Sequence, residues 1–397
     1  MAKQVLPKGF LASGVHCGIK RFNKDLGLIY SPSACKAAGV FTKNKVKAAP
    51  VIVAKDTLNK GKPIHAVVVN SGNANCCTGR YGTRDAKRMI NAVAENLRLK
   101  AANVYVASTG IIGKRLPVVK IVDAIPKAVK RLSEKGLFSV AKSILTTDRK
   151  IKVETEKFQI GSKEVTICGI CKGAGMIQPD MATMLCFIMT DARIDKDALK
   201  ASLKKSVQSS FNSITIDGDM STNDCVLVLA NGQAHNKVIK KDTKEFDIFM
   251  KHLSRVSFEL AKDIIKDGEG ATKFVSVHVK GAKTDRDAEI VSRAVASSLL
   301  VKTSIHGQDA NWGRIASSVG ASMVGSVKQN KIEIFLDGVC FFRKGKFASP
   351  QREKISRVYK KRNINILVYL NSGKKEAKIW TCDLSKKYVE INSHYMT

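Results

Sequence analysis

The sequence predicts an α/β sandwich followed by a smaller α+β domain. Strand-like and helix-like hydrophobic patterns alternate along the first part of the chain, whereas its end mixes a helix with short strands and hairpins. A chain of 397 residues is also long enough to bury more than one core. We place the boundary in the polar, turn-rich stretch 281–287, which gives expected domains of residues 1–284 and 285–397.

The first predicted elements follow one another closely. Residues 65–70 form an apolar run typical of a buried strand, and the turn-forming cluster 71–73 ends it. Thr83 begins a predicted helix whose apolar positions share one face, at Ala86, Ile90, Val93 and Leu97. Residues 103–107 predict the next strand, which leads into the segment 108–113.

Later elements are predicted from the same periodicities. Residues 184–189 are a strand-sized apolar run, and a helix is expected from the spacing of Leu199, Leu203, Val207 and Phe211. Thr243 is expected to cap a longer helix that ends at Asp267 and Gly268, before an alternating strand at 273–279. Residues 344–346, Lys-Gly-Lys, predict a hairpin turn in the last domain.

Charge and composition exclude several classes of protein. The net charge of +34 would suit a nucleic-acid binder, but the lysines are scattered in pairs, and aromatic residues make up only 6%. We therefore interpret them as solvated surface charge and keep nucleic-acid binding only as a weak alternative. The longest apolar run is strand-sized and the N-terminus lacks a signal pattern, so no membrane association and a cytoplasmic location are expected.

The ten cysteines do not predict a metal site. In a chain without a secretion signal we expect them to stay reduced. Cys168 and Cys171 form a Cys-x-x-Cys pair, but no second pair of ligands follows at zinc-binding spacing. We therefore interpret the pair as residues of a buried strand.

The segment 172–185 is the most informative for function. Two glycines and a proline precede Thr183, which stands at the start of the apolar run. If the bond between Ala182 and Thr183 breaks, the new α-amine, with a pKa of about 7.7–8.0, can accept the proton of the threonine's own hydroxyl. One residue would then supply both nucleophile and base. From the spacing alone, a structural threonine at a strand entrance is the commoner interpretation.

Five stretches resemble one known family, in the family's order. They are residues 172–185, Lys-Gly-Ala-Gly-Met-Ile-Gln-Pro-Asp-Met-Ala-Thr-Met-Leu, together with 69–75, 217–224, 306–314 and 388–392. On these motifs the chain resembles the ornithine acetyltransferases of arginine biosynthesis over nearly its whole length. The resemblance implies a layered αββα sandwich of the self-cleaving threonine-nucleophile kind.

The resemblance also implies roles for particular residues. Cleavage between Ala182 and Thr183 would give an α chain of residues 1–182 and a β chain of residues 183–397, assembled as two α and two β chains. Thr183 would be the nucleophile, and Thr109 and Gly110 would form the oxyanion hole. The implied substrate-binding residues are Thr146, Lys172, Thr183, Glu269, Asn392 and Thr397.

The implied activity is transfer of an acetyl group from N-acetylornithine to glutamate through an acetylated Thr183. This is the reaction of a glutamate N-acetyltransferase in the cyclic route of arginine biosynthesis. No metal or organic cofactor is expected, and the sequence leaves open whether acetyl-CoA is a second acetyl donor. A peptidase or amidase with the same self-cleavage chemistry, which would transfer the acyl group to water, is the main alternative.

Some positions depart from the family pattern or imitate other sites. Asp180 stands where asparagine is usual, and the final residues 393–397 differ from the familiar ending, which bears on processing and on contacts of the tail. Residues 217–228 resemble the start of a calcium loop but lack its glycine and final glutamate, so calcium binding is not expected. His306 and Asp309 are interpreted as structural, because no serine elbow accompanies them.

Overall fold

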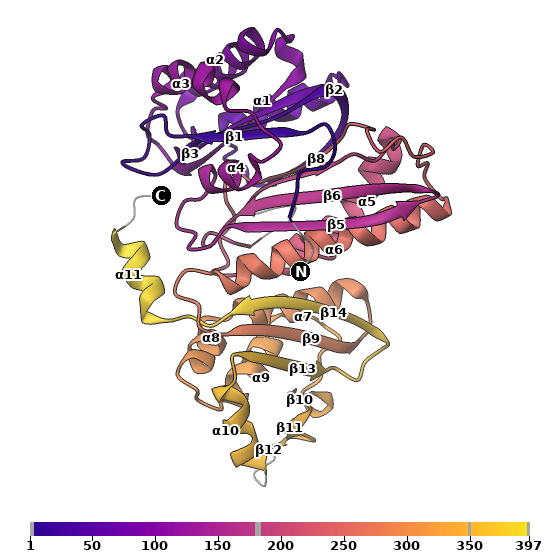
Figure 1. The fold of residues 1–397 in the computed structure, drawn as a ribbon. Helices are drawn as coiled ribbons and strands as arrows, with labels where there is room; N and C mark the ends of the chain where they lie inside the picture. The colour runs from indigo at the N-terminus through magenta and orange to yellow at the C-terminus, as the bar shows by residue number, and fades with distance from the viewer. Residues whose placement is uncertain (1–3, 179–183, 348–350, 395–397) are drawn as a thin grey trace.

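The computed structural model describes residues 4–178, 184–347 and 351–394, without the side chains of Arg352 and His394. These residues form two β-sheets with helices packed on them (Figure 1). The larger sheet belongs to the N-terminal part of the chain and the smaller one to the C-terminal part.

The larger sheet has eight strands in the order β4-β3-β2-β8-β7-β6-β5, with β1 paired to β2. Strand β2 (Leu26–Phe41) pairs with β3 through its first half and with β8 through its second half. The other strands are β1 (Leu11–Val15), β3 (Ile64–Asn73), β4 (Val104–Ile111), β5 (Lys152–Ile160), β6 (Lys163–Lys172), β7 (Leu185–Thr190) and β8 (Cys225–Ala230).

Because β2 is shared, the two halves of the sheet pack face to face. One apolar cluster joins Val67 and Val69 of β3 to Phe187 of β7 and Leu227 of β8. Helices cover the two outer faces, with α2 (Gly79–Leu97) and α3 (Val118–Lys130) on β3 and β4, and α5 (Lys196–Gln208) and α6 (Lys244–Lys266) on the other half. Figure 1 shows these four layers, which confirm the predicted αββα sandwich. The remaining helices of this part are α1 (Ala49–Asn59) and α4 (Leu137–Ser143).

The smaller sheet has six strands in the order β12-β11-β10-β13-β9-β14. Its strands are β9 (Phe274–Ala282), β10 (Glu333–Leu336), β11 (Val339–Arg343), β12 (Lys346–Phe347), β13 (Asn363–Tyr369) and β14 (Lys375–Cys382). Its helices are α7 (Asp285–Ser297), α8 (Leu299–His306), α9 (Trp312–Ala321) and α10 (Arg352–Lys360). Strand β9 runs parallel to β13 and antiparallel to β14. The sheets therefore divide the chain between α6 and β9, ahead of the boundary expected at residue 284.

Several predicted elements are confirmed. Thr243 caps α6, because its side chain accepts a hydrogen bond from the Phe246 amide at 3.3 Å. The hairpin turn between β11 and β12 has Lys344 and Gly345 at positive φ, as a tight two-residue turn requires.

Within the described residues, no helix is both long and apolar enough to cross a membrane.

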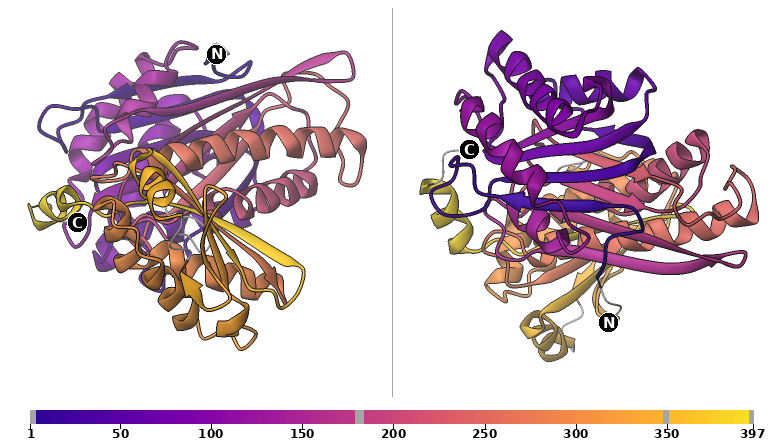
Figure 2. Two further views of the ribbon diagram at one scale, coloured as in Figure 1. Left: turned by 90° about the horizontal axis from the view of Figure 1, so that it is seen from below. Right: turned by 45° about the horizontal axis from the view of Figure 1, so that its top comes forward.

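The C-terminal helix α11 (Lys386–His394) returns to the first domain. It follows β14, yet in Figures 1 and 2 it lies at the side of the molecule, apart from the helices of the second domain. Its contacts with the larger domain help to build the candidate site described below.

Two glycines let helix α4 lie directly on strands β1 and β2. Gly14 and Gly27 are opposite each other in the β1–β2 ladder. A Cβ atom on Gly14 would lie 2.1 Å from the Ser139 carbonyl oxygen, and one on Gly27 would lie 2.5 Å from Ser143 Oγ. Any larger residue would push α4 away from the sheet, so the packing of this layer depends on both glycines.

We predict that Gly14→Ala lowers the free energy of unfolding by about 1–3 kcal/mol, the usual cost of overfilling a packed core. Chemical denaturation of the purified protein measures this. Gly320→Ala in α9 is the matched control, since nothing lies within 4 Å of a Cβ atom there and stability should be unchanged or slightly raised. Equal stability of the two variants would contradict the packing argument.

Candidate active site

A cavity of about 190 Å³ lies where the ends of strands from both halves of the large sheet meet. Strands β4 and β6 end there, and β7 and β8 begin there. Its lining includes Thr109, Gly110, Thr146, Lys172, Gly175, Met184, Asp217, Asp219, Asn223, Asp224, Glu269, Tyr388 and Asn392. Pockets that hold drug-sized ligands are about 300–1,000 Å³, so this cavity suits a molecule of amino-acid size.

Six residues expected to act in the site line this single cavity, although they are far apart in the sequence. They are Thr109, Gly110, Thr146, Lys172, Glu269 and Asn392. Met184, which directly follows the expected nucleophile, lines it as well. Thr183 itself lies outside the described residues, as do Ala182, Asp180 and Thr397. The structure therefore brings together every described member of the expected set.

The wall formed by Thr109 and Gly110 depends on close packing of two strands. Gly110 has φ +130°, and a Cβ atom there would lie 2.4 Å from the Gly72 carbonyl carbon of β3. Asn223 fixes this wall from the opposite side, because its buried side-chain amide donates to the Ser108 carbonyl at 2.8 Å and to the Ala74 carbonyl at 2.7 Å. The backbone around Thr109 is thus held by the contact between β3 and β4 and by the side chain of Asn223.

Glu269 joins the C-terminal helix to the cavity. Its carboxylate is buried and accepts a hydrogen bond from Asn392 Nδ2 of α11 at 2.8 Å. A Cβ atom on Gly175 would lie 2.5 Å from Glu269 Oε2, so any larger residue there would displace the Glu269 carboxylate. The Glu269 amide also donates to the Ala174 carbonyl at 2.8 Å. The tail therefore docks on the residue that is expected to bind substrate.

Asp217 fixes the chain that leads into the expected cleavage region. Its carboxylate accepts hydrogen bonds from the Met176 amide at 2.6 Å and from the Ile177 amide at 2.8 Å. The Tyr388 hydroxyl of α11 donates to the same carboxylate at 3.2 Å. Burial, together with the negative charge of Asp217, raises the pKa of that hydroxyl above its ordinary range. In the sequence, Asp217 belongs to a stretch that resembles the family and that imitates a calcium loop, and neither feature indicates this anchoring role.

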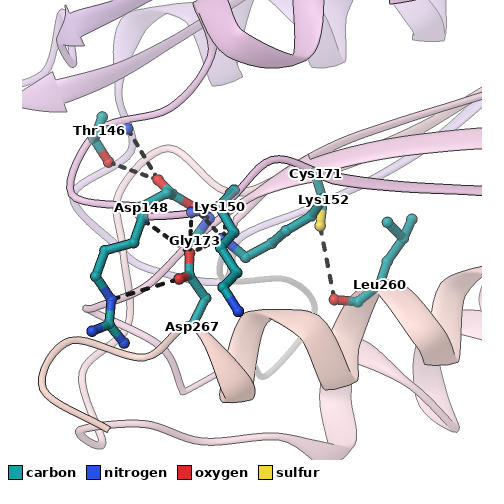
Figure 3. Close-up of polar contacts among 9 residues, drawn as sticks. Thr146, Asp148, Lys150, Lys152, Cys171, Gly173, Leu260 and Asp267 are labelled. Atoms are coloured by element: carbon teal, nitrogen blue, oxygen red, sulfur yellow. Dashed lines mark hydrogen bonds and ion pairs between the residues drawn. The ribbon is translucent and has the colours of Figure 1, made fainter. Parts of the chain in front are cut away.

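A buried charge network connects the chain around Thr146 with Gly173 and Asp267 (Figure 3). Lys152 is 1% exposed, and its Nζ lies 2.7 Å from Asp148 Oδ1 and 2.6 Å from Asp267 Oδ2. Burial acts against the charge on Asp148, but Lys152 and Lys172 outweigh it and lower the pKa of the carboxyl. Burial likewise acts against the charge on Lys152, but Asp148 and Asp267 outweigh it and raise the pKa of the ammonium group. Asp148 and Lys152 are therefore both charged at neutral pH.

This network positions three segments of the site. Asp148 also accepts hydrogen bonds from the Thr146 amide at 3.0 Å and the Gly173 amide at 2.7 Å. Asp267 accepts from the Arg149 and Lys150 amides and stands two residues before Glu269. Thr146, Lys172 and Glu269 thus each lie within two residues of a group held by the network. Nothing in the sequence singles out this network, because Lys152 is one of 68 basic residues.

The other candidate sites have structural explanations. Cys168 and Cys171 of β6 belong to different apolar clusters, on opposite faces of the strand. His306 Nδ1 lies 2.8 Å from Asp383 Oδ2, which also accepts a hydrogen bond from Thr272. Within the described ranges, no group of three or more His, Cys, Asp and Glu residues could hold a metal ion.

The chain has extensive similarity to known proteins. The sequence pattern of the ArgJ family matches residues 11–397. An arginine biosynthesis bifunctional protein ArgJ from Caldanaerobacter subterraneus subsp. tengcongensis is 47% identical, covering 99% of this chain and 98% of that protein. The one from Thermotoga neapolitana is 45% identical, covering 99% and 100%. The crystal structure of the Bacillus halodurans protein has a TM-score of 0.50 and 38% identity, covering 53% of this chain and 98% of that one.

We predict that Lys152→Met lowers the free energy of unfolding at pH 7 by about 3–5 kcal/mol, because it leaves two buried carboxylates without their cation. Denaturant unfolding at pH 7 and at about pH 2.5, below the unfolded pKa of Asp148, measures the effect and its pH dependence. Since the native pKa of Asp148 is lowered, its stabilisation is complete above its unfolded pKa of about 3.9 and is lost as the pH falls further. The difference between wild type and variant should therefore shrink in acid.

Lys157→Met is the matched control for this prediction. Lys157 forms an ion pair with Glu164 at 2.9 Å, but both side chains are nearly half exposed. Removing such a pair should cost at most about 1 kcal/mol. A Lys152→Met variant no less stable than this control would show that the network does not hold the site together.

Proposed function

Because this chain belongs to the ArgJ family, it is an acyltransferase of arginine biosynthesis, and we propose that it transfers acetyl from N-acetylornithine to glutamate through an acetyl ester on Thr183. One observation carries this proposal. Thr109, Gly110, Thr146, Lys172, Glu269 and Asn392 line one cavity with Met184, the residue directly after Thr183. A set chosen from separate stretches of sequence would not share one small cavity by chance.

The first step is cleavage of the chain between Ala182 and Thr183. The hydroxyl of Thr183 attacks the Ala182 carbonyl, and water then hydrolyses the resulting ester and leaves a free α-amine on Thr183. The match to the Bacillus halodurans crystal structure supports this step, because 98% of that solved chain corresponds to only 53% of this one. A β chain of residues 183–397 would make up about 54%, or 215 of the 397 residues.

Acetyl transfer then follows in two half-reactions. The α-amine takes the proton of the Thr183 hydroxyl, the oxygen attacks the acetyl carbonyl, and ornithine leaves with a proton on its nitrogen. Glutamate next attacks the acetyl ester and leaves as N-acetylglutamate. Thr109 and Gly110 stabilise the oxyanion in both half-reactions, a contribution typically of about 3–4 kcal/mol for one donor. One site that binds both substrates in turn gives ping-pong kinetics.

The charges of the cavity suit these substrates. Its lining carries the carboxylates of Asp217, Asp219 and Glu269, which favour the amino groups of ornithine. Lys172 is the cation of the lining and binds a substrate carboxylate. Thr146 and Asn392 complete the contacts, and Thr397 is proposed as a further contact from the end of the tail. The acidic lining contrasts with the net charge of +34 on the whole chain.

Three further features belong to the proposal. The relatives are named bifunctional, which suggests a second acetyl donor, and we propose acetyl-CoA for this role. We propose that the reaction uses no metal or organic cofactor. The α and β chains stay together and assemble as two of each. A cytoplasmic location is proposed, and some relatives are named mitochondrial proteins.

We predict that wild-type protein gives two fragments, the second starting at Thr183, and that Thr183→Ala stays intact and inactive. The variant lacks the hydroxyl that attacks Ala182. Intact mass spectrometry of the purified proteins checks both outcomes, and their unfolding midpoints control for folding. Wild-type protein that remains uncleaved after prolonged incubation, or an active Thr183→Ala variant, would overturn the proposal.

We further predict that cleaved enzyme incubated with N-acetylornithine and glutamate yields N-acetylglutamate and ornithine in equal amounts. Without glutamate, at most one ornithine per active site should be released quickly, because the acetyl ester waits for its acceptor. Chromatography of the products measures this. Continuous release of acetate, with no N-acetylglutamate formed, would instead identify an amidase that transfers the acyl group to water.

A further inference from the structure

One buried carboxyl group of the cavity lining has an oxygen atom that the described residues leave unpaired. Asp224 immediately precedes β8 and is 2% exposed, and it lines the cavity. Among the described residues, none forms a hydrogen bond with its buried Oδ2 atom. Leaving such an atom unpaired is destabilising, so an unpaired buried group in a native protein calls for an explanation, of which a catalytic role is one.

The other carboxylates of the cavity are accounted for. Glu269 accepts a hydrogen bond from Asn392, and Asp217 accepts two backbone amides and the Tyr388 hydroxyl. Asp219 is exposed to solvent. Asp224 is therefore the buried carboxyl with an oxygen free for another group.

Asp224 also lies beside the start of the strand that follows the proposed cleavage point. Strands β7 and β8 are parallel, with Leu185 opposite Cys225, and the Cys225 amide donates to the Met184 carbonyl at 2.8 Å. Asp224 and Met184 are thus neighbours at the entrance of the two strands. The bond proposed to break is the one just before Thr183, the residue that directly precedes Met184 in the sequence.

Burial raises the pKa of the Asp224 carboxyl well above its ordinary range, against the opposing effects of a hydrogen bond from Ser221 and the charge of Lys172. The group therefore keeps its proton to a higher pH than an exposed carboxyl group does. A neutral carboxyl has one oxygen that donates a proton and one that accepts, which suits transfer between two nearby atoms.

The uncleaved chain lacks the base that serves the mature enzyme. Before cleavage, the nitrogen of residue 183 belongs to a peptide bond and cannot accept the hydroxyl proton. We propose that Asp224 carries the proton during self-cleavage, the task that the free α-amine performs afterwards. This inference rests on the proposed function, since it assumes that cleavage occurs before Thr183.

The proton balance of this step is complete. As the bond between Thr183 Oγ and the Ala182 carbonyl carbon forms, the hydroxyl proton passes to the accepting oxygen of Asp224. As the bond from that carbon to the residue 183 nitrogen breaks, the proton on the other oxygen passes to the nitrogen. Asp224 ends neutral, as it began, and the product is the ester that water hydrolyses to a free amine, a hydroxyl and the Ala182 carboxylate.

The test measures cleavage and acetyl transfer separately in the full-length chain. Freshly synthesised Asp224→Asn precursor is followed by intact mass spectrometry, and its cleavage should be at least about 100-fold slower than wild type, the lower range for loss of general acid–base catalysis. Asp224→Glu should restore at least about a tenth of the wild-type rate. Acetyl transfer per cleaved molecule of Asp224→Asn is measured alongside and should fall much less than cleavage does, because the mature enzyme has its own amine.

Controls separate the inference from folding and from the proposed function. Asp85→Asn removes a buried, unpartnered carboxyl outside the cavity lining and should cleave at the wild-type rate. Asp224→Asn precursor that cleaves within about threefold of wild type would overturn the inference but not the function. Equal slowing of cleavage and transfer would also overturn it. If the Asp224→Asn variant unfolds at a lower denaturant concentration than wild type, the Asp224→Glu variant is the test instead. An Asp224→Glu protein that is as stable as wild type but is not cleaved would overturn the inference. Wild-type protein that never cleaves would instead overturn the proposed function.

Discussion

The buried contact of Lys152 with Asp148 and Asp267 is the interaction on which the geometry of the site depends. Separating a charge from water is expensive, and it is tolerated here because each carboxylate also accepts backbone amides. Those amides come from the chain around Thr146 and from the end of β6. Because neither carboxylate can move without losing several bonds, the three segments keep fixed positions relative to one another (Figure 3).

Local patterns were sufficient to predict elements but not the relations between them. The cap at Thr243, the helical spacing that follows it and the Lys344–Gly345 turn are set by neighbouring residues, and all three are confirmed. The place of β9 depends on pairing with β13, which begins about ninety residues later, and no local signal encodes that partner. For this reason the sheets divide the chain earlier than the polar stretch at 281–287 indicated.

The same limit applies to the candidate site. Thr109, Lys172 and Glu269 are ordinary residues in their own segments, and only the family resemblance indicated that they act together. Lys152 could not be singled out, because its burial arises only when β5 packs beside β6 and the end of α6. The charge of the whole chain was equally uninformative, since charges interact over roughly 10 Å in salt and the cavity has its own, mostly acidic, lining.

The position of the proposed cleavage explains how the two resulting chains could stay associated. Strand β6 would belong to the α chain and β7 to the β chain, yet they are neighbours in the sheet, joined over six residue pairs. The same holds for β2 and β8, so two ladders would cross the cut. Apolar clusters on both faces of these strands also contain residues from both sides of residue 183. Separation would require breaking the centre of the sheet, so cleavage can expose a new amine while the cavity around it keeps its shape.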